Sequence, residues 1–140
     1  MTNFNLFGEA VLKNSGNIKI AVNHNSTNLL HPIRFLSEEF KPLPMQNYSY
    51  FNGKASYDSD VRKRFGYSIA TQYGTFYNGT LLQIMADFNY RVQPWANFTL
   101  TAEQNNIKLA TDYGSDNLTL LGFRADIAFS KNIIWASYVQ

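Results

Sequence analysis

Hydrophobic and polar residues alternate along much of this chain, and the stretch LLQIMADFNYRVQPW at residues 81–95 shows the pattern most clearly. From Leu82 to Val92 the even-numbered positions are apolar, whereas the odd-numbered positions from 83 onward are polar or charged, apart from Met85. Successive side chains of a β-strand point to opposite faces of a sheet, so this period of two predicts a strand with one apolar and one polar face. The pattern alone leaves open which of the two faces meets water.

The same alternation recurs along the chain and predicts eight strands, whereas convincing helical periodicity is nearly absent. The reversals between the strands fall alternately at the two ends of a meander. We therefore expect an all-β fold, an antiparallel up-and-down meander over residues 1–140 that forms either a single β-barrel domain or a fragment of a larger barrel. The predicted strands are about 4–13, 17–24, 48–57, 64–77, 81–95, 96–104 and 117–130, with an eighth that begins near Ile133.

Turn chemistry marks the reversals. Asn78-Gly79 is the strongest hairpin signal, because both residues tolerate positive φ, and Pro94 cannot continue a central strand. Short turns at one end of a meander and longer loops at the other are typical of outer-membrane barrels. Here the connections near 14–16, 58–63, 92–95 and 130–132 share one end, and those near 25–47, 78–79 and 105–116, two of them long, share the other.

The longest connection, residues 25–47, is the segment where a helix fits best. Pro32 lies near the start of the HPIRFLSEEFKPLP stretch and Pro42 near its end, so one or two helical turns are expected over about 33–40. Loops of this length are uncommon in small domains and often functional. A plain surface excursion and a functional loop both stay open.

Composition narrows the class of protein. Charged residues make up 16% of the chain, against about 25% in a typical soluble domain, and aromatic residues make up another 16%. The formal net charge is +2 and no long basic run concentrates it, which argues against a nucleic-acid partner. Cysteine is absent, which excludes disulfides, thiolate metal sites and thiol nucleophiles.

Three features favour a membrane barrel over a soluble one. Several predicted strands are longer than the roughly 9–11 residues with which a tilted strand spans a bilayer; charges recur on the polar parity of neighbouring strands, where they can pair across the sheet; and Tyr and Trp gather at strand ends, as in an interfacial aromatic girdle. The candidate lumen-facing polar residues are Asp87, Arg91, Glu103, Arg124 and Asp126, the candidate lipid-facing residues are Leu82, Ile84, Phe88, Phe123 and Ile127, and the candidate interface aromatics are Tyr77, Tyr90 and Trp95.

A soluble β-barrel that binds a small apolar ligand is the alternative, because the same alternation arises when the apolar face points inward. In such a barrel the aromatic parity would line the ligand cavity, and the charged parity would be a solvated outer surface. The alternation itself does not decide between the two.

An ordered series of elements covers residues 74–140: GTFYNG, YRVQPW, NNIKLATDYGS, LLGFRADIAFS and NIIWASYVQ. The series resembles a stretch near the C-terminus of large outer-membrane proteins of Bacteroidota, which join an N-terminal carbohydrate-binding module of the family 9 type to a C-terminal β-barrel domain of unknown function. The resemblance implies an outer-membrane barrel of more than eight strands, of which this chain is one part. The chain departs from the family at Ala110, where a proline is frequent, and it lacks the carbohydrate-binding module.

No catalytic constellation accompanies these features. His24 and His31 lack metal-ligand spacing, Asp58 and Asp60 fit a turn without a cation, and phosphate-binding and nucleophile motifs are absent. We therefore expect a non-enzymatic, membrane-embedded segment of a bacterial outer-membrane β-barrel, with a structural or transport role and neither cofactor nor metal. The expected partners are the lipid bilayer and further β-strands from the same parent protein or another chain.

Overall fold

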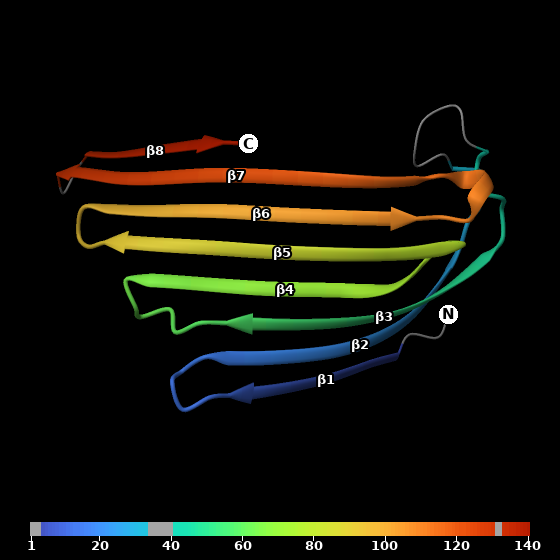
Figure 1. Cartoon of the computed structure of the whole chain (residues 1–140), viewed down its shortest axis with the longest axis horizontal. Coiled ribbons are helices and arrows are strands. Elements are labelled where there is room, and N and C mark those ends of the chain that lie inside the picture. Colours follow the sequence, from blue (N-terminus) through green and yellow to red (C-terminus); the bar gives the residue numbers. More distant parts are fainter. Residues whose placement is uncertain (1–3, 34–40, 131–132) are drawn as a thin grey trace.

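The computed structural model describes residues 4–33, 41–130 and 133–140, and within them eight strands form one antiparallel sheet (Figure 1). Each strand pairs with its sequence neighbours, which confirms the predicted up-and-down meander. Among the described residues no pairing joins β1 to β8, so the sheet is open. The elements are β1 (Phe4–Val11), β2 (Asn17–Asn28), β3 (Asn47–Asp58), β4 (Phe65–Phe76), β5 (Gly79–Val92), β6 (Ala96–Lys108), the 3-10 turn η1 (Thr111–Tyr113), β7 (Ser115–Ser130) and β8 (Ile133–Val139).

Two strands extend further toward the long connections than their hydrophobic pattern predicts. β2 continues to Asn28 and β6 to Lys108, beyond the expected ends near 24 and 104. The added residues are mostly polar and carry no apolar alternation, yet they keep the ladder, with Asn28 opposite Asn47. The polar ends of these strands therefore belong to the sheet.

The register of the ladders gives the sheet two chemically distinct faces. Residues directly opposite one another in an antiparallel pair point to the same side, so the rows of the ladder define each face. One row consists of apolar residues only, and the next row, on the other side, is polar or small. The first row is Tyr67, Phe88, Leu100, Phe123 and Val139, and the second is Ser68, Asp87, Thr101 and Gly122. We call these sides the apolar face and the polar face.

Charge follows the same division along the whole sheet. Of the charged residues in the described strands, Lys108 alone lies on the apolar face, at the last position of β6. The charged residues on the polar face are Glu9, Lys19, Lys54, Asp58, Asp87, Arg91, Glu103, Asp116, Arg124 and Asp126. A sheet with water on both of its faces would not need its charged residues confined to one of them.

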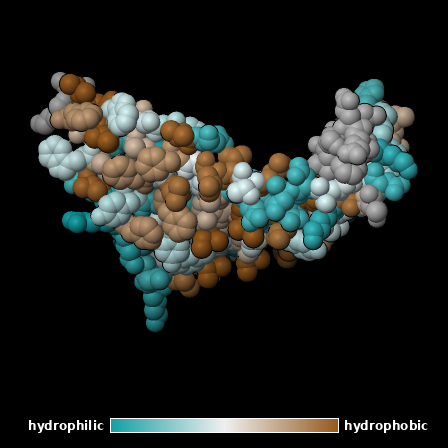
Figure 2. All heavy atoms as spheres, turned by 45° about the horizontal axis from the view of Figure 1, so that its top comes forward, coloured by the Kyte–Doolittle hydropathy of each residue, from teal (hydrophilic) through white to brown (hydrophobic). Residues whose placement is uncertain are grey.

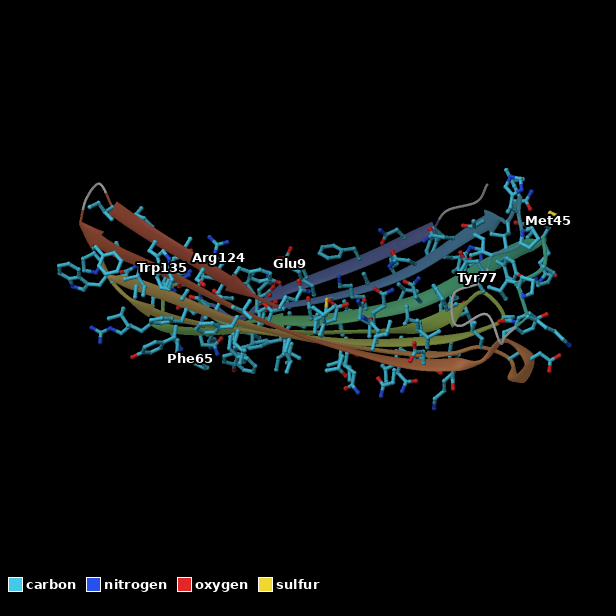
Figure 3. The ribbon with its side chains drawn as sticks, turned by 90° about the horizontal axis from the view of Figure 1, so that it is seen from above. Glu9, Met45, Phe65, Tyr77, Arg124 and Trp135 are labelled. Atoms are coloured by element: carbon cyan, nitrogen blue, oxygen red, sulfur yellow. The ribbon has the colours of Figure 1, made fainter. Side chains whose placement is uncertain are left out.

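The sheet is twisted and curls toward its polar face (Figure 3). β1 and β8 rise toward one side, on which Glu9 and Arg124 lie, whereas Phe65 lies on the opposite, outer side. Because Phe65 stands opposite Tyr90 in the ladder, the apolar face is the convex one. Figure 2 shows hydrophobic side chains over the body of the sheet and hydrophilic ones around the long connections at one end.

Those long connections hold a small buried cluster at the end of the polar face. Ile33 and Leu43 form an isolated antiparallel bridge, and Leu43 is almost fully buried. Residues 34–40, on which the expected helical turns fall, lie outside the described residues. The cluster consists of Leu29, Leu43 and Tyr48, with Tyr50, Tyr77 and Tyr113 packed against it.

The hairpin between β4 and β5 differs by one position from the expected Asn78-Gly79 turn. Phe76 pairs with Gly79, so the two loop residues are Tyr77 and Asn78, and Tyr77 takes the positive φ of 50°. Gly79 is instead the first residue of β5, where an added Cβ would collide with the backbone carbonyl of Lys108 in β6. A close approach between strands therefore explains this glycine better than turn geometry does.

Replacing Gly79 with alanine is expected to destabilise the sheet by about 1–3 kcal/mol, because backbone must shift to admit the methyl group. The added Cβ would also lie 2.6 Å from Leu109 Cα, whereas at Gly53 the nearest heavy atom, Tyr73 O, is 4.0 Å away. Gly53→Ala is therefore the matched control, expected within about 0.5 kcal/mol of the parent. Urea unfolding followed by tryptophan fluorescence compares the two, and equal unfolding midpoints would contradict the close approach.

Candidate functional site

The polar face carries short hydrogen bonds that tie β5 to β6. Thr101 Oγ1 donates to Asp87 Oδ1 at 2.7 Å, and Gln83 Nε2 donates to Glu103 Oε1 at 2.8 Å. Asn105 Nδ2 donates to the same Glu103 oxygen at 2.7 Å. Both carboxylates are thus held by neutral hydroxyl and amide donors, which satisfies them without a cation.

The arginines of this face are held differently. Arg91 Nε donates to Asn89 Oδ1 at 3.1 Å, and its Nη1 donates to the Val61 carbonyl at 2.9 Å in the turn between β3 and β4. Arg124 Nε lies 3.0 Å from Asp126 Oδ2, two residues along the same strand. One guanidinium is thus oriented by neutral acceptors and the other by a carboxylate.

The five candidate lumen residues share the polar face, but they do not form the expected ion pairs across neighbouring strands. The one ion pair within the set, Arg124–Asp126, joins residues of a single strand. The register explains the difference, because Arg91 lies opposite Asn97 and Asp87 opposite Thr101, so no carboxylate faces Arg91 directly. Sequence parity places residues on a face, but only the register decides which of them meet.

A cross-strand ion pair that the sequence did not indicate joins β2 to β3, also on the polar face. Lys19 Nζ of β2 is 3.3 Å from Asp58 Oδ2 of β3, and the two side chains are 41% and 37% exposed. At that exposure such a pair contributes at most about 1 kcal/mol. The alternation with Ile18 and Ile20 predicts that Lys19 lies on the polar face. Its contact with Asp58, two positions from the residue directly opposite, depends on the register between β2 and β3, which no local pattern encodes.

Of the hollows on the polar face, two that lie toward opposite ends of the strands differ in chemistry. The larger, about 430 Å³, lies toward the short turns and is lined by groups of both signs, among them Lys19, Asp58, Asp87 and Arg91. The other, about 330 Å³, lies toward the long connections, and no charged residue of the described chain lines it. Its walls are amides, hydroxyls, a glycine, an aliphatic side chain and aromatic rings: Asn25, Thr27, Tyr50, Asn52, Gln72, Gly74, Thr75, Phe76, Tyr77 and Leu81.

The candidate lipid-facing residues all share the apolar face. Leu82, Ile84, Phe88 and Phe123 are 36–45% exposed, and Ile127 lies opposite Trp135 at the end of the ladder between β7 and β8. Nothing in the described part of the chain forms a second layer over this face.

The three candidate interface aromatics do not form one group. Tyr90 lies on the apolar face and is 50% exposed, and Trp95 lies in the turn between β5 and β6 and is 61% exposed. The prediction for Tyr77 is wrong, because Tyr77 packs against the buried cluster on the concave side (Figure 3). Its ring centroid lies 5.1 Å from that of Tyr48. The positive φ of Tyr77 breaks the strand parity from which its outward orientation was predicted.

The described residues contain no group of three or more His, Asp or Glu side chains that could hold a metal ion. His24 instead contacts Ser49, with Nε2 and Oγ 2.7 Å apart. No helix in the described chain has the length and apolarity to cross a membrane. The chain matches no protein-family model, no curated protein and no solved structure.

The turn between β3 and β4 holds a carboxyl group with a strongly shifted pKa. Arg62 donates hydrogen bonds from its side chain and its backbone N–H to Asp60, with Nε 2.9 Å from Oδ1, and this lowers the pKa of Asp60 to about 2. Arg62→Gln is therefore expected to raise the Asp60 pKa toward the ordinary value of about 3.9. Titration of the carboxyl ¹³C resonance by NMR measures the shift.

The sign of the accompanying stability change follows from the direction of this pKa shift. Because the folded-state pKa lies below the unfolded value, Asp60 stabilises the fold above about pH 4 and loses that contribution as the pH falls toward 2. Lys63→Gln is the matched control, since Lys63 is the weakest of the causes that lower this pKa. An Asp60 pKa that stays near 2 in Arg62→Gln would refute this origin of the shift.

Proposed function

We propose that the chain is a membrane-embedded segment of a bacterial outer-membrane β-barrel, with a non-catalytic structural or transport role. The observation that carries the proposal is the apolar face of the sheet, on which Lys108, at the end of β6, is the one charged residue of the described strands. On β5 this face runs from Leu82 to Val92, about 33 Å at the rise of an antiparallel strand. Tilted by about 45°, this length covers about 23 Å, close to the roughly 25 Å apolar band of outer-membrane barrels.

The lack of a core supports the same proposal. The described hydrophobic residues that are buried are Leu29, Leu43, Tyr48 and Ala125, although 45% of the chain is hydrophobic. The accessible surface is 9891 Å², about a third more than the roughly 7,400 Å² that size scaling gives for a soluble monomer of this mass. A bilayer would cover the apolar face that the sheet leaves open.

The direction of curvature favours the membrane proposal over a soluble ligand-binding barrel. A soluble barrel for an apolar ligand requires the aromatic parity on the concave side, whereas Phe65 lies on the convex side and Glu9 and Arg124 lie on the concave side (Figure 3). A polar concave face suits a lumen, because its charged groups are kept from lipid.

Further strands are part of the proposal. β1 and β8 have one partner each among the described residues, and an unpaired strand edge in hydrocarbon costs several kcal/mol per exposed polar group. Strands from the same parent protein or from another chain would close the sheet, in line with the resemblance of residues 74–140 to a larger barrel.

Ala86→Arg tests the proposal, because Ala86 lies midway along the apolar face of β5, in the row of Ile69, Ala102 and Leu121. Arginine at the bilayer midplane is expected to cost about 2–4 kcal/mol of folding free energy. The measurement is urea-dependent folding into phospholipid vesicles, followed by the change in electrophoretic mobility of the folded form.

The matched control is Met85→Arg, one residue away on the polar face and opposite Glu103, where the new charge gains a nearby carboxylate. It is expected to fold as well as the parent. Equal effects of the two substitutions, or a monodisperse folded chain in buffer without detergent, would reject the membrane proposal.

A further inference from the structure

A small hollow at the short-turn end of the polar face is lined almost entirely by cations. It measures about 220 Å³, against about 30 Å³ for a water molecule, and its walls are Arg62, Lys63, Arg64, Arg91 and Gln93. No carboxylate lines it. The first three residues come from the turn between β3 and β4, and the last two from the end of β5 and the turn that follows.

Two of these cations are direct cross-strand neighbours. The ladder of β4 and β5 begins with Phe65 opposite Tyr90, and the next pair outward is Arg64 and Arg91, joined by a bond of 2.7 Å from Arg91 N to Arg64 O. Like charges directly opposite one another destabilise a sheet. An anion between them would convert this repulsion into attraction.

The nearby carboxylates are committed elsewhere. Asp60 accepts two bonds from the Arg62 side chain, Asp58 pairs with Lys19, and Asp87 accepts from Thr101. Within the described residues no carboxylate lies within ion-pair distance of the cations of Lys63, Arg64 or Arg91. Asp60 neutralises Arg62, whereas the positive charges of Lys63, Arg64 and Arg91 are not neutralised from within the described part of the sheet.

Two of the three guanidinium groups that line the hollow, those of Arg62 and Arg91, are already oriented. Asn89 and the Val61 carbonyl hold Arg91, and Asp60 holds Arg62, whose Nη2 also donates to Ser15 Oγ. A planar guanidinium fixed in this way offers its remaining N–H groups as a fork that matches the oxygens of phosphate. Orientation before binding lowers the entropic cost of capturing a ligand.

From these observations we propose that the hollow binds a phosphate-class oxyanion, either free in solution or as the headgroup of a lipid. Arg64 and Arg91 hold the anion between the strands, and Lys63 adds a third positive charge from the turn. The site requires no metal and no closed barrel, so its presence is independent of the membrane proposal.

The test is calorimetric titration of the full chain in an uncharged detergent with inorganic phosphate at low ionic strength. Arg64→Gln and Lys63→Gln are the primary variants, because both residues are exposed and neither side chain is part of the hydrogen bonds described above, including those that orient Arg91. Each is expected to weaken binding at least about fivefold, as for loss of one charge-assisted contact. Arg91→Gln is expected to weaken it further, and far-UV circular dichroism checks that each variant folds.

Lys54→Gln is the matched control, since it removes the same charge from the same face in the middle of β3, away from the hollow. A second arm measures binding to vesicles of phosphatidylglycerol and of phosphatidylcholine. Binding in the vesicle arm alone, lost in Arg64→Gln, identifies a lipid headgroup as the source of the anion. No binding in either arm, or an equal loss in Lys54→Gln, overturns the proposal.

Discussion

The register of the antiparallel ladders is the constraint on which the rest of this structure depends. Because side chains alternate with a period of two, a slip of one residue between β4 and β5 would move Asp87 and Arg91 onto the apolar face. The bonds from Thr101 to Asp87 and from Gln83 to Glu103 fix the next ladder from the polar side. The segregation of charge and the juxtaposition of Arg64 and Arg91 both follow from this alignment.

A single layer also changes where stability comes from. In a soluble domain two layers bury their apolar faces against each other, whereas here the buried cluster around Leu43 lies at one end, and none of the described residues covers the middle of the sheet. Backbone pairing and the polar-face bonds hold the strands together but contribute little apolar burial. The surroundings of the convex face therefore decide whether the sheet is stable, and in the proposed function a bilayer supplies them.

The local pattern was enough to predict the number and direction of the strands and the division of their residues between two faces, because a period of two is visible in adjacent residues. It failed where a structure depends on distant partners. The polar end of β2 pairs with β3 although it has no apolar alternation. Tyr77 has a positive φ and therefore lies on the concave side. Lys41 and Asp112, which come from two different connections, form an ion pair at 3.0 Å. The Arg64–Arg91 contact belongs to the same class, since two basic residues 27 positions apart (91 − 64) become neighbours only through the register.

The size of the side chains on the concave face bears on how wide a closed barrel would be. In an eight-stranded barrel the interior is just wide enough for side chains to fill it. On the polar face of β4, Gly66, Ser68, Ala70 and Gly74 alternate with no charged residue, and Gln72 and Phe76 are the larger side chains of that row. The ring of Tyr138 in β8 lies over Gly122 of β7. Along β4 the side chains of this face are mostly short, so the proposed lumen would come closest to the backbone beside this strand. The additional strands proposed above would also pair the edges of β1 and β8, which have one partner strand each among the described residues.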